Sequence, residues 1–350
     1  MRAKDSEADR RRYQADLAQG VERFLQPRRT DCPWCASTRI RVLLHSPEFV
    51  QHKPGRFTLE RCADCGHVFQ NPCLNEAGLE FYYRDFYDGL GAELCDRVMD
   101  SAGLRRAYLR RARMLPQGTE PRTWLDVGTG HGHFCRSARQ VWPNVRFDGL
   151  DQSESVLKAQ KLGWIHHAYQ GTFPQRAEEL AGRYDVVSMH HYLEHTADQH
   201  RQLDTAARVL RPGGHLLIEV PDPQCLPARL LGRYWFSWMQ PQHLHFAPEA
   251  NLTRALQDRG FTIVAVHRRR ARLSQDFVWA PGLLAGNLHP PVDRPWSPRR
   301  PHPGDRLLRL ALLALAVPVM PVGLLADWTL GLLSRRSNTY RILAALPETA

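Results

Sequence analysis

The chain lacks several features that would place it in other classes of protein. Its first residues, Met1-Arg-Ala-Lys-Asp-Ser-Glu, have no apolar stretch behind the basic residues, so we expect no secretory signal peptide. It shows no internal repeat, which excludes a repeat array, and no G-x-x-x-x-G-K-[ST] loop for nucleotide phosphates. With 43% hydrophobic and 24% charged residues it is an ordinary globular chain, and its 350 residues predict about two domains.

The chain is basic, but its charge is unevenly distributed. It carries 47 Lys and Arg against 36 Asp and Glu, a formal charge of +11. Residues 1–29 hold eight basic and five acidic side chains, and residues 269–350 hold eleven and five, so most of the excess lies at the two ends. A basic protein often binds nucleic acid, but the middle of this chain is nearly neutral, which argues against that function. We interpret residues 1–29 as a basic arm.

Two pairs of cysteines near the N-terminus have the spacing of metal ligands. Cys32 and Cys35 form one C-x2-C turn, and Cys62 and Cys65 form another. A tight turn of this kind brings both thiolates to one ion, and four thiolates complete a closed tetrahedral site. We therefore expect a structural zinc ribbon that binds Zn²⁺. The alternative is two accidental pairs, or a site that has lost its metal.

The rest of the chain divides by its sequence pattern. Residues 30–75 hold the cysteine pairs, and residues 76–118 are helical and aromatic-rich, which predicts a connector or lid. From 119 to 280, short apolar runs alternate with helical stretches, as is typical of βαβ units in a mostly parallel sheet. Seven prolines within 281–304 predict a linker, and an apolar tail follows over 305–350. The expected strands are Thr123–Val127, Arg146–Leu150, Asp185–Met189, Leu216–Val220 and Phe261–Val266.

A glycine-rich turn after the first expected strand is the most informative segment. There the run Trp124-Leu-Asp-Val leads into Gly128, Gly130 and Gly132, and a helical pattern follows. Glycine permits positive φ and lets a ligand approach the backbone. The G-x-G-x-G spacing differs from the G-x-G-x-x-G fingerprint of dinucleotide-binding folds. Asp126, just before the glycines, would repel a phosphate and suits a cationic ligand.

A second acid ends the next expected strand. Asp151 closes the run Phe147-Asp-Gly-Leu-Asp, nineteen residues after Gly132. A carboxylate at this point can accept two hydrogen bonds from ribose hydroxyls, as in other nucleoside-binding βαβ folds. Asp126 and Asp151 together therefore predict a site for a cationic ligand that contains a nucleoside.

With these residues in place, the chain resembles the class I S-adenosylmethionine-dependent methyltransferases over about residues 120–270. The resemblance implies an α/β fold with a Rossmann-like seven-stranded sheet, an antiparallel pair at one edge, and methyl transfer from S-adenosylmethionine. The cysteine pairs and the run Cys65-Gly-His-Val-Phe-Gln-Asn-Pro also resemble bacterial methyltransferases of glycan and natural-product pathways. Four motifs carry the resemblance to the class I methyltransferases: Leu125-Asp-Val-Gly-Thr-Gly-His-Gly, Gly149-Leu-Asp, Tyr184-Asp-Val-Val-Ser-Met-His-His-Tyr-Leu-Glu-His and Leu210-Arg-Pro-Gly-Gly-His-Leu-Leu-Ile-Glu-Val-Pro.

The resemblance assigns the methyl-donor site residue by residue. Asp126 and the loop Gly128–Gly132 would hold the methionine part of the donor, and Asp151 would hold its ribose. No acid follows the third strand, where the chain reads Ala168-Tyr-Gln-Gly, so we expect backbone groups and Gln170 to recognise the adenine. The complete set expected around the donor is Asp126, Gly128, Thr129, Gly130, Gly132, Asp151, Gln152, Gln170, Gly171 and His190.

Two histidine clusters supply candidate bases for the methyl acceptor. We take Glu194 and His195, after the fourth strand, and His243, after the fifth, as candidate catalytic residues. A hydroxyl or acidic C–H acceptor needs a base, and histidine suits this role near neutral pH. In the sugar C-methyltransferases that the chain resembles, a Glu-His pair stands where this chain has Gln242-His243, so O-methylation is at least as well favoured as C-methylation. For His195 the alternative is packing of the donor loop.

A long apolar run marks the C-terminal tail. Leu310–Ala326 comprises 17 residues without a charge, whereas spanning a bilayer takes about 20 apolar residues. Pro318 and Pro321 would break a straight helix. Residues 305–333, flanked by arginines, suit a membrane interface; the alternatives are packing on the protein's own surface or in a dimer. We expect a hairpin of two short helices, Asp305–Val317 and Val322–Leu333.

These patterns predict a cytoplasmic methyltransferase, peripheral on the inner face of the membrane. Its acceptor would be a small molecule, a sugar or a lipid-linked intermediate, methylated on oxygen or carbon. One alternative is an RNA methyltransferase that grips RNA with the ribbon and the arm. The neutral middle argues against nucleic acid, as does the absence of an Asn/Asp-Pro-Pro-aromatic motif at His190-His-Tyr-Leu. The other alternative is a non-catalytic scaffold with a vestigial domain. The patterns leave the oligomeric state and the identity of the acceptor open.

Overall fold

The chain forms two compact units, each assembled from separated stretches of sequence. Unit 1 comprises Met1–Ala92, Pro223–Phe246 and Leu273–Asn338, and unit 2 comprises Glu93–Asp222, Ala247–Arg272 and Thr339–Ala350. The computed structural model describes residues 7–85, 97, 99–268, 275–288, 293–297, 302–333 and 337–348. Parts of the expected arm, connector, linker and tail therefore lie outside the described residues, as does Cys95.

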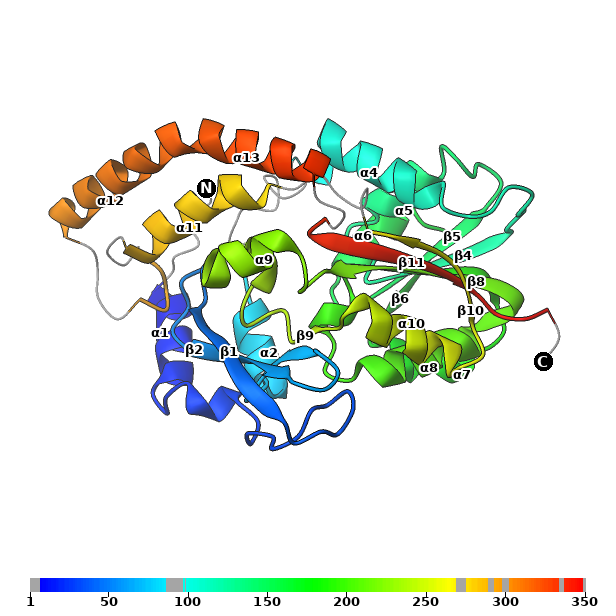
Figure 1. Ribbon diagram of the computed structural model, residues 1–350, viewed down its shortest axis with the longest axis horizontal. Coiled ribbons are helices and arrows are strands. Elements are labelled where there is room, and N and C mark those ends of the chain that lie inside the picture. Colours follow the sequence, from blue (N-terminus) through cyan, green and yellow to red (C-terminus); the bar gives the residue numbers. More distant parts are fainter. Residues whose placement is uncertain are drawn as a thin grey trace. The chain divides into compact units, whose positions relative to one another are not determined.

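Unit 2 is built around a seven-stranded sheet with the order β10-β11-β8-β7-β4-β5-β6 (Figure 1). The neighbours β4–β5, β4–β7, β5–β6 and β7–β8 are parallel, whereas β11 is antiparallel to both β8 and β10. The expected parallel sheet with an antiparallel pair at one edge is confirmed. Its strands are β4 (Thr123–Val127), β5 (Arg146–Asp151), β6 (His167–Gln170), β7 (Tyr184–His190), β8 (Leu210–Pro221), β10 (Thr262–His267) and β11 (Thr339–Ala345).

Two strands of the sheet are absent from the five that the apolar pattern predicted, although the resemblance implied a third strand just before Gly171. β6 is only four residues long and polar, so it gives no periodic apolar signal. β11 lies in the segment that we assigned to the apolar tail, and this boundary is corrected: the last strand of the sheet follows the long apolar helix. β8 and β10 flank β11 on both sides, and its Ile342 and Leu343 side chains are at most 1% exposed.

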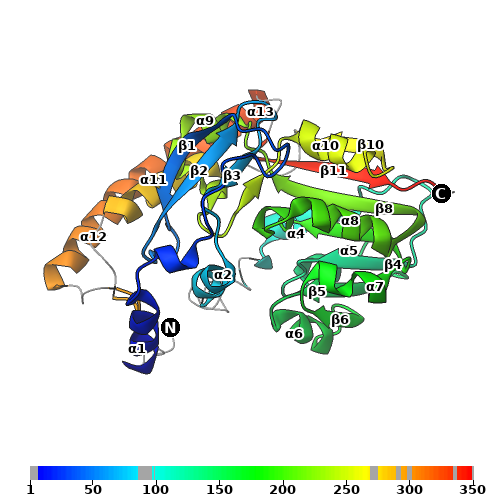
Figure 2. The same ribbon diagram turned by 90° about the horizontal axis from the view of Figure 1, so that it is seen from below.

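Helices pack on the unit 2 sheet and bury its apolar core (Figures 1 and 2). Tyr108 and Phe134, from two of these helices, pack with Trp124 and Phe147 of the sheet. α8 begins at Asp198, whose side chain accepts a hydrogen bond from the Arg201 amide (3.0 Å), a typical N-cap. The helices are α4 (Ala102–Ala112), α5 (His133–Ala138), α6 (Ser155–Lys161), α7 (Ala177–Leu180), α8 (Gln199–Val209) and α10 (Glu249–Gln257), with 3-10 turns η2 (Phe173–Arg176) and η3 (Leu193–His195).

Unit 1 contains a four-stranded antiparallel sheet with the order β1-β2-β3-β9 (Figure 2). Its last strand comes from residues 223–246, a stretch that the sequence pattern placed in the methyltransferase domain and that packs with unit 1. Tyr13 of α1 is 1% exposed and packs on Phe81 and Trp296, so the basic arm is anchored. The elements are α1 (Glu7–Leu17), η1 (Glu22–Phe24), β1 (Ile40–Pro47), β2 (Arg56–Cys62), β3 (Val68–Gln70), α2 (Glu76–Tyr83), α9 (Leu226–Leu230), η4 (Gly232–Tyr234), η5 (Phe236–Trp238) and β9 (His245–Phe246).

The apolar tail is one long, curved helix instead of the expected hairpin (Figure 1). α12 (Pro303–Ala316) passes through the 3-10 turn η6 (Val317–Val319) into α13 (Met320–Leu333). Pro318 and Pro321 stand in the first turns of η6 and α13, where the missing N–H costs least. The two prolines therefore bend the helix without reversing it.

A second helix, α11 (Asp276–Leu288), packs antiparallel to α12 and α13 (Figure 1). It runs through Pro281, so the expected linker does not begin there. Asp327, the charge that interrupts the apolar run, accepts hydrogen bonds from the amides of Phe277 (3.3 Å) and Val278 (3.2 Å) at the start of α11. A side chain at Gly323 would place its Cβ 2.5 Å from the carbonyl oxygen of Phe277, so the two helices touch closely.

Candidate active site

The carboxyl ends of β4, β5 and β6 meet at one edge of the unit 2 sheet. β4 pairs with β5 on one side and with β7 on the other, so the strand order reverses at β4. Open α/β sheets bind ligands outside the strand ends at such a switch point. The register places Asp151 directly opposite Gln170. The loop Gly128–Gly132, Asp151 and Gln170 therefore share one edge of the sheet.

The glycine loop has a conformation that side chains would disturb. Gly128, Gly130 and Gly132 have φ angles of +75°, +52° and +81°, in the left-handed region. A Cβ on Gly128 would lie 2.7 Å from the Tyr192 ring, and one on Gly132 would lie 2.9 Å from the Cβ of Ala159. A Cβ on Gly130 would meet no heavy atom within 4 Å. The loop is therefore packed at both ends and faces open space at its middle, as a ligand cradle requires.

Asp151 links this loop to the end of β5. Its Oδ2 accepts a hydrogen bond from the Gly130 amide (2.9 Å), and its Oδ1 accepts two from Ser153, from the amide (2.8 Å) and the hydroxyl (2.7 Å). An ionised carboxylate has about four acceptor positions, so this partly exposed group keeps acceptor capacity for about one further donor, such as a ribose hydroxyl. Gln152, Gln170 and Gly171, three further expected residues, lie near Asp151. The Gly171 amide donates to the Asp151 carbonyl (3.0 Å), and Gln170 Nε2 donates to the Gln152 carbonyl (3.5 Å).

Asp126 places a carboxylate beneath the loop. It is 3% exposed and accepts hydrogen bonds from the hydroxyls of Ser188 (2.5 Å) and Thr129 (2.9 Å). Burial raises the pKa of Asp126 to about 6, although these two hydrogen bonds favour the charged form. The group is therefore mostly ionised at neutral pH, and its negative charge favours a cation in the loop.

His190 ends β7 beside the first turn of α5. Its ring lies 4.5 Å from the Phe134 ring, edge to face, and neither ring nitrogen has a hydrogen-bond partner among the described residues. Burial lowers the pKa of His190 well below its usual range, so the imidazole is neutral. A buried polar group without a partner is rare in a folded protein. The expected place of His190 at the donor site remains a prediction.

A buried ion cluster behind β7 was missed by the sequence analysis. Glu219 of β8, fully buried, contacts the guanidinium groups of Arg111 and Arg341, with Arg111 Nε 3.1 Å from Oε2. His191 lies between two carboxylates, 3.0 Å from Glu219 and 3.0 Å from Glu194. The one available signal was Glu219 itself, an acid inside an apolar strand, because buried carboxylates need partners.

The cluster fixes the ionisation of its members. Burial alone would raise the pKa of Glu219, but Arg111, His191 and Arg341 hold it well below the usual range. Burial alone would lower the pKa of His191, but its hydrogen bonds with Glu194 and Glu219 raise it. His191 has a φ of +53°, a strained value for a non-glycine residue, which the two hydrogen bonds hold in place. The chain after β7 is thereby set in one conformation.

The candidate bases lie in different units. Glu194 (0% exposed) and the partly exposed His195 form the 3-10 turn η3 of unit 2. His243 belongs to unit 1, where its Nδ1 donates to the Ser237 carbonyl (2.8 Å). That bond leaves the lone pair of the neutral ring on Nε2, the arrangement a general base needs. A shared role for these three residues remains a prediction.

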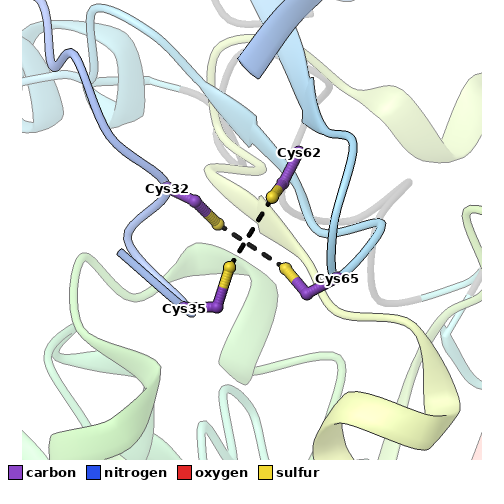
Figure 3. A group of neighbouring side chains, drawn as sticks. All are labelled: Cys32, Cys35, Cys62 and Cys65. Carbon is purple, nitrogen blue, oxygen red and sulfur yellow. Dashed lines mark hydrogen bonds between the residues drawn. The ribbon is translucent and has the colours of Figure 1, made fainter. Parts of the chain in front are cut away.

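The four predicted metal ligands come together in unit 1 (Figure 3). Their sulfur atoms lie within 4.8 Å of one another, with 3.6 Å between Cys32 and Cys65 and 3.6 Å between Cys35 and Cys62. A tetrahedron with metal–sulfur bonds of about 2.3 Å has edges of about 3.8 Å. None of the four is in a disulfide. The donor set and its spacing therefore fit a tetrahedral ion such as zinc; we call these residues the cysteine cluster.

Comparison with known sequences identifies the domain that contains this edge. Residues 100–266 match the sequence family described as a methyltransferase domain. That range holds the glycine loop, Asp126 and Asp151. It is a class I S-adenosylmethionine-dependent methyltransferase domain. The methyltransferase domain supplies six of the seven strands, whereas the cysteine cluster and α11–α13 lie outside the matched range.

Curated relatives match parts of the methyltransferase domain. The ubiquinone biosynthesis O-methyltransferase of Pseudomonas paraeruginosa is 27% identical over 135 residues, 37% of this chain and 57% of that protein. The enzyme of the same name from Cronobacter sakazakii is 33% identical over 97 residues, 26% of this chain and 39% of that protein. The chain thus spans less than two thirds of these relatives. A methyltransferase structure from Archaeoglobus fulgidus aligns with a TM-score of 0.45 and 16% identity, over 73% of this chain and 99% of that one.

Proposed function

We propose that this protein transfers the methyl group of S-adenosylmethionine to oxygen or carbon of a small-molecule acceptor, such as a sugar or a lipid-linked intermediate. The observation that supports this most is the junction of Gly130 and Asp151, where a glycine cradle and a ribose-type carboxylate meet beside a buried anion, Asp126. The curated relatives are named as O-methyltransferases, which favours oxygen as the accepting atom.

The reaction needs alignment more than a metal. The sulfur–methyl bond of the donor breaks as the acceptor attacks in line, the sulfur keeps the bonding electrons, and S-adenosylhomocysteine leaves. The acceptor loses a proton, for which His195 and His243 are the candidate bases. Asp126 and Asp151 would hold the two ends of the donor. The buried Glu219 cluster would act only by positioning the chain from His191 to His195.

A methyl-transfer assay tests this function. Labelled S-adenosylmethionine is incubated with the full chain and a bacterial sugar and lipid extract, and label in the extract is measured. Gly128→Ala should reduce transfer roughly 100-fold, since its Cβ would meet Tyr192 at 2.7 Å and displace the loop. Gly103→Ala is the matched control, because its Cβ would meet no heavy atom within 4 Å. Equal transfer by both variants, or none by the wild type in any extract, would contradict the proposal.

We infer that the cysteine cluster holds one structural Zn²⁺. Four thiolates fill the tetrahedral positions, so a zinc ion there would have no open site for a substrate and would stabilise the fold instead. Its apolar surroundings are small, with Phe69 buried and Trp34 and Ile40 partly buried around the thiols. Zinc would therefore take the place of a larger core in this segment.

We also propose that α11, α12 and α13 bind the surface of a membrane. Large apolar side chains are exposed along the continuous helix of α12 and α13, from Leu307 to Leu332, and only 6% of its most apolar stretch is buried. Asp327 is only 6% exposed and accepts hydrogen bonds from α11 amides, so its carboxylate does not lie on this exposed surface. Trp279 and Trp328 are 51% and 64% exposed, as is typical of side chains at a lipid interface. Such a surface suits a lipid-linked acceptor.

Vesicle flotation tests the membrane proposal. The full chain should float with anionic vesicles, and the double variant Leu315→Glu and Leu325→Glu should float at least tenfold less. These leucines are 69% and 59% exposed. Leu157→Glu, on α6 and 37% exposed, is the control and should float like the wild type. A wild type that stays in the dense fractions and forms a dimer by ultracentrifugation would show that a second copy covers this surface instead.

A further inference from the structure

Three arginines of unit 1 gather beside the cysteine cluster. Arg41 of β1 and Arg61 of β2 are directly opposite each other in the strand register. Like charges in this position repel and destabilise the sheet. Arg229 of α9 belongs to the same group, because it lines one pocket together with Arg61. The fold thus concentrates three positive charges at one place.

The charge of these arginines is not balanced in the described part of the chain, because a zinc-bound cysteine cluster would carry about −2 and offset only part of their combined positive charge. Arg41, Arg61 and Arg229 have no ion pair with any described acid. The acids of the same segment are already engaged, since Glu60 pairs with Arg28 and Asp64 pairs with Arg39. Guanidinium groups that gather in excess of their counter-ions are expected where an anionic ligand supplies the missing negative charge.

The arginines border a pocket with room for such a ligand. Its volume is about 300 Å³, at the lower end for small-molecule sites. Arg61 and Arg229 line it together with Gly66, which follows the second cysteine turn, and with Pro223 and Gln224. All of these residues belong to unit 1, so the pocket does not depend on the donor site. We call it the arginine pocket.

We propose that the arginine pocket binds the phosphate or diphosphate group of a small molecule. Planar guanidinium groups bind phosphate oxygens in pairs, and two or three of them match the charge of a diphosphate. The small volume of the pocket favours a small group over a polymer. So does the surrounding segment, because residues 30–75 hold five basic and four acidic side chains and form no extended basic surface. This proposal stands whether or not the protein transfers methyl groups.

Titration of the full chain with pyrophosphate and with uridine diphosphate tests the pocket. Calorimetry should detect binding to the wild type, at least tenfold weaker binding to Arg61→Gln and Arg229→Gln, and weaker binding at high salt. Arg56→Gln is the matched control: it removes the same charge from the same strand, roughly 16 Å away along β2, and should bind like the wild type. Pyrophosphate should also raise the melting temperature of the wild type and not that of Arg61→Gln.

Two further measurements distinguish a soluble phosphate ligand from a lipid headgroup. Binding of uridine diphosphate without Arg61-dependent binding to phosphatidic acid vesicles would indicate a soluble ligand. Arg61-dependent binding to those vesicles, measured in the Leu315→Glu, Leu325→Glu background, would indicate a lipid headgroup. No binding of any of these probes, an equal loss in Arg56→Gln, or binding of RNA alone would overturn the proposal. Because Arg61→Gln relieves repulsion, its melting temperature without ligand should not fall below that of the wild type.

Discussion

Replacing Glu219 with glutamine should lower the free energy of unfolding by about 3–5 kcal/mol. Glu219 is 0% exposed and contacts two guanidinium groups, those of Arg111 and Arg341, which are themselves 5% and 2% exposed. Glutamine preserves the shape of the side chain but removes its charge. Two buried cations would then have no counter-ion at this position, and the desolvation cost of each would no longer be offset. Urea denaturation followed by tryptophan fluorescence measures the change.

The matched control for this variant is Glu178→Gln. Glu178 also pairs with an arginine, Arg208, but both side chains are exposed, at 82% and 56%. Exposed pairs contribute about 0–1 kcal/mol, so this variant should unfold close to the wild type. A loss of under 1 kcal/mol in Glu219→Gln, equal to that of the control, would show that the buried cluster does not stabilise unit 2.

Removing zinc should unfold the segment that carries the cysteine cluster. Peptides of similar size gain about 10–16 kcal/mol of apparent binding free energy from structural zinc, which is their folding free energy. This segment has only a small apolar cluster around its thiols. We expect one zinc per chain by elemental analysis, and we expect a strong chelator to open the segment to proteases between Cys32 and Cys65.

Cysteine variants separate metal binding from general destabilisation. Cys35→Ser and Cys62→Ser should each lose the zinc and become protease-sensitive in this segment. Cys73→Ser lies outside the cluster and should keep both the zinc and the resistance. Full zinc content in Cys35→Ser, or a metal-free wild type that already resists proteases, would contradict a structural zinc site.

Local patterns predicted the parts of this protein whose physics is local. The five expected strands were found because each is a short apolar run bounded by turn residues. The glycine loop was found because positive φ at three alternate positions demands glycine. The cysteine cluster was found because its ligand spacing is fixed by the geometry of a turn, and its four thiols come together as predicted.

Features that depend on distant contacts were missed. β11 reads as part of a tail, and only pairing with β8 and β10 makes it a strand. Pro281 reads as a helix breaker, yet α11 passes through it. Pro318 and Pro321 suggested a chain reversal, but each stands in the first turn of a new element and the helix continues. Glu219 signals a buried partner, but its partners, Arg111 and Arg341, lie more than one hundred positions away in the chain.

Calorimetric titration of the full chain with S-adenosylmethionine tests the donor site most directly. The wild type should bind one equivalent at pH 7.5, and Asp151→Ala should bind roughly 100-fold more weakly, having lost a charged hydrogen-bond acceptor. Burial raises the pKa of Asp126 to about 6, so the ionised carboxylate is less stable in the free protein than in water. A cationic donor would stabilise that ionised form. Affinity should therefore fall as the pH drops through about 6. No binding by the wild type, or undiminished binding by Asp151→Ala, would contradict a methyl-donor site at this edge of the sheet.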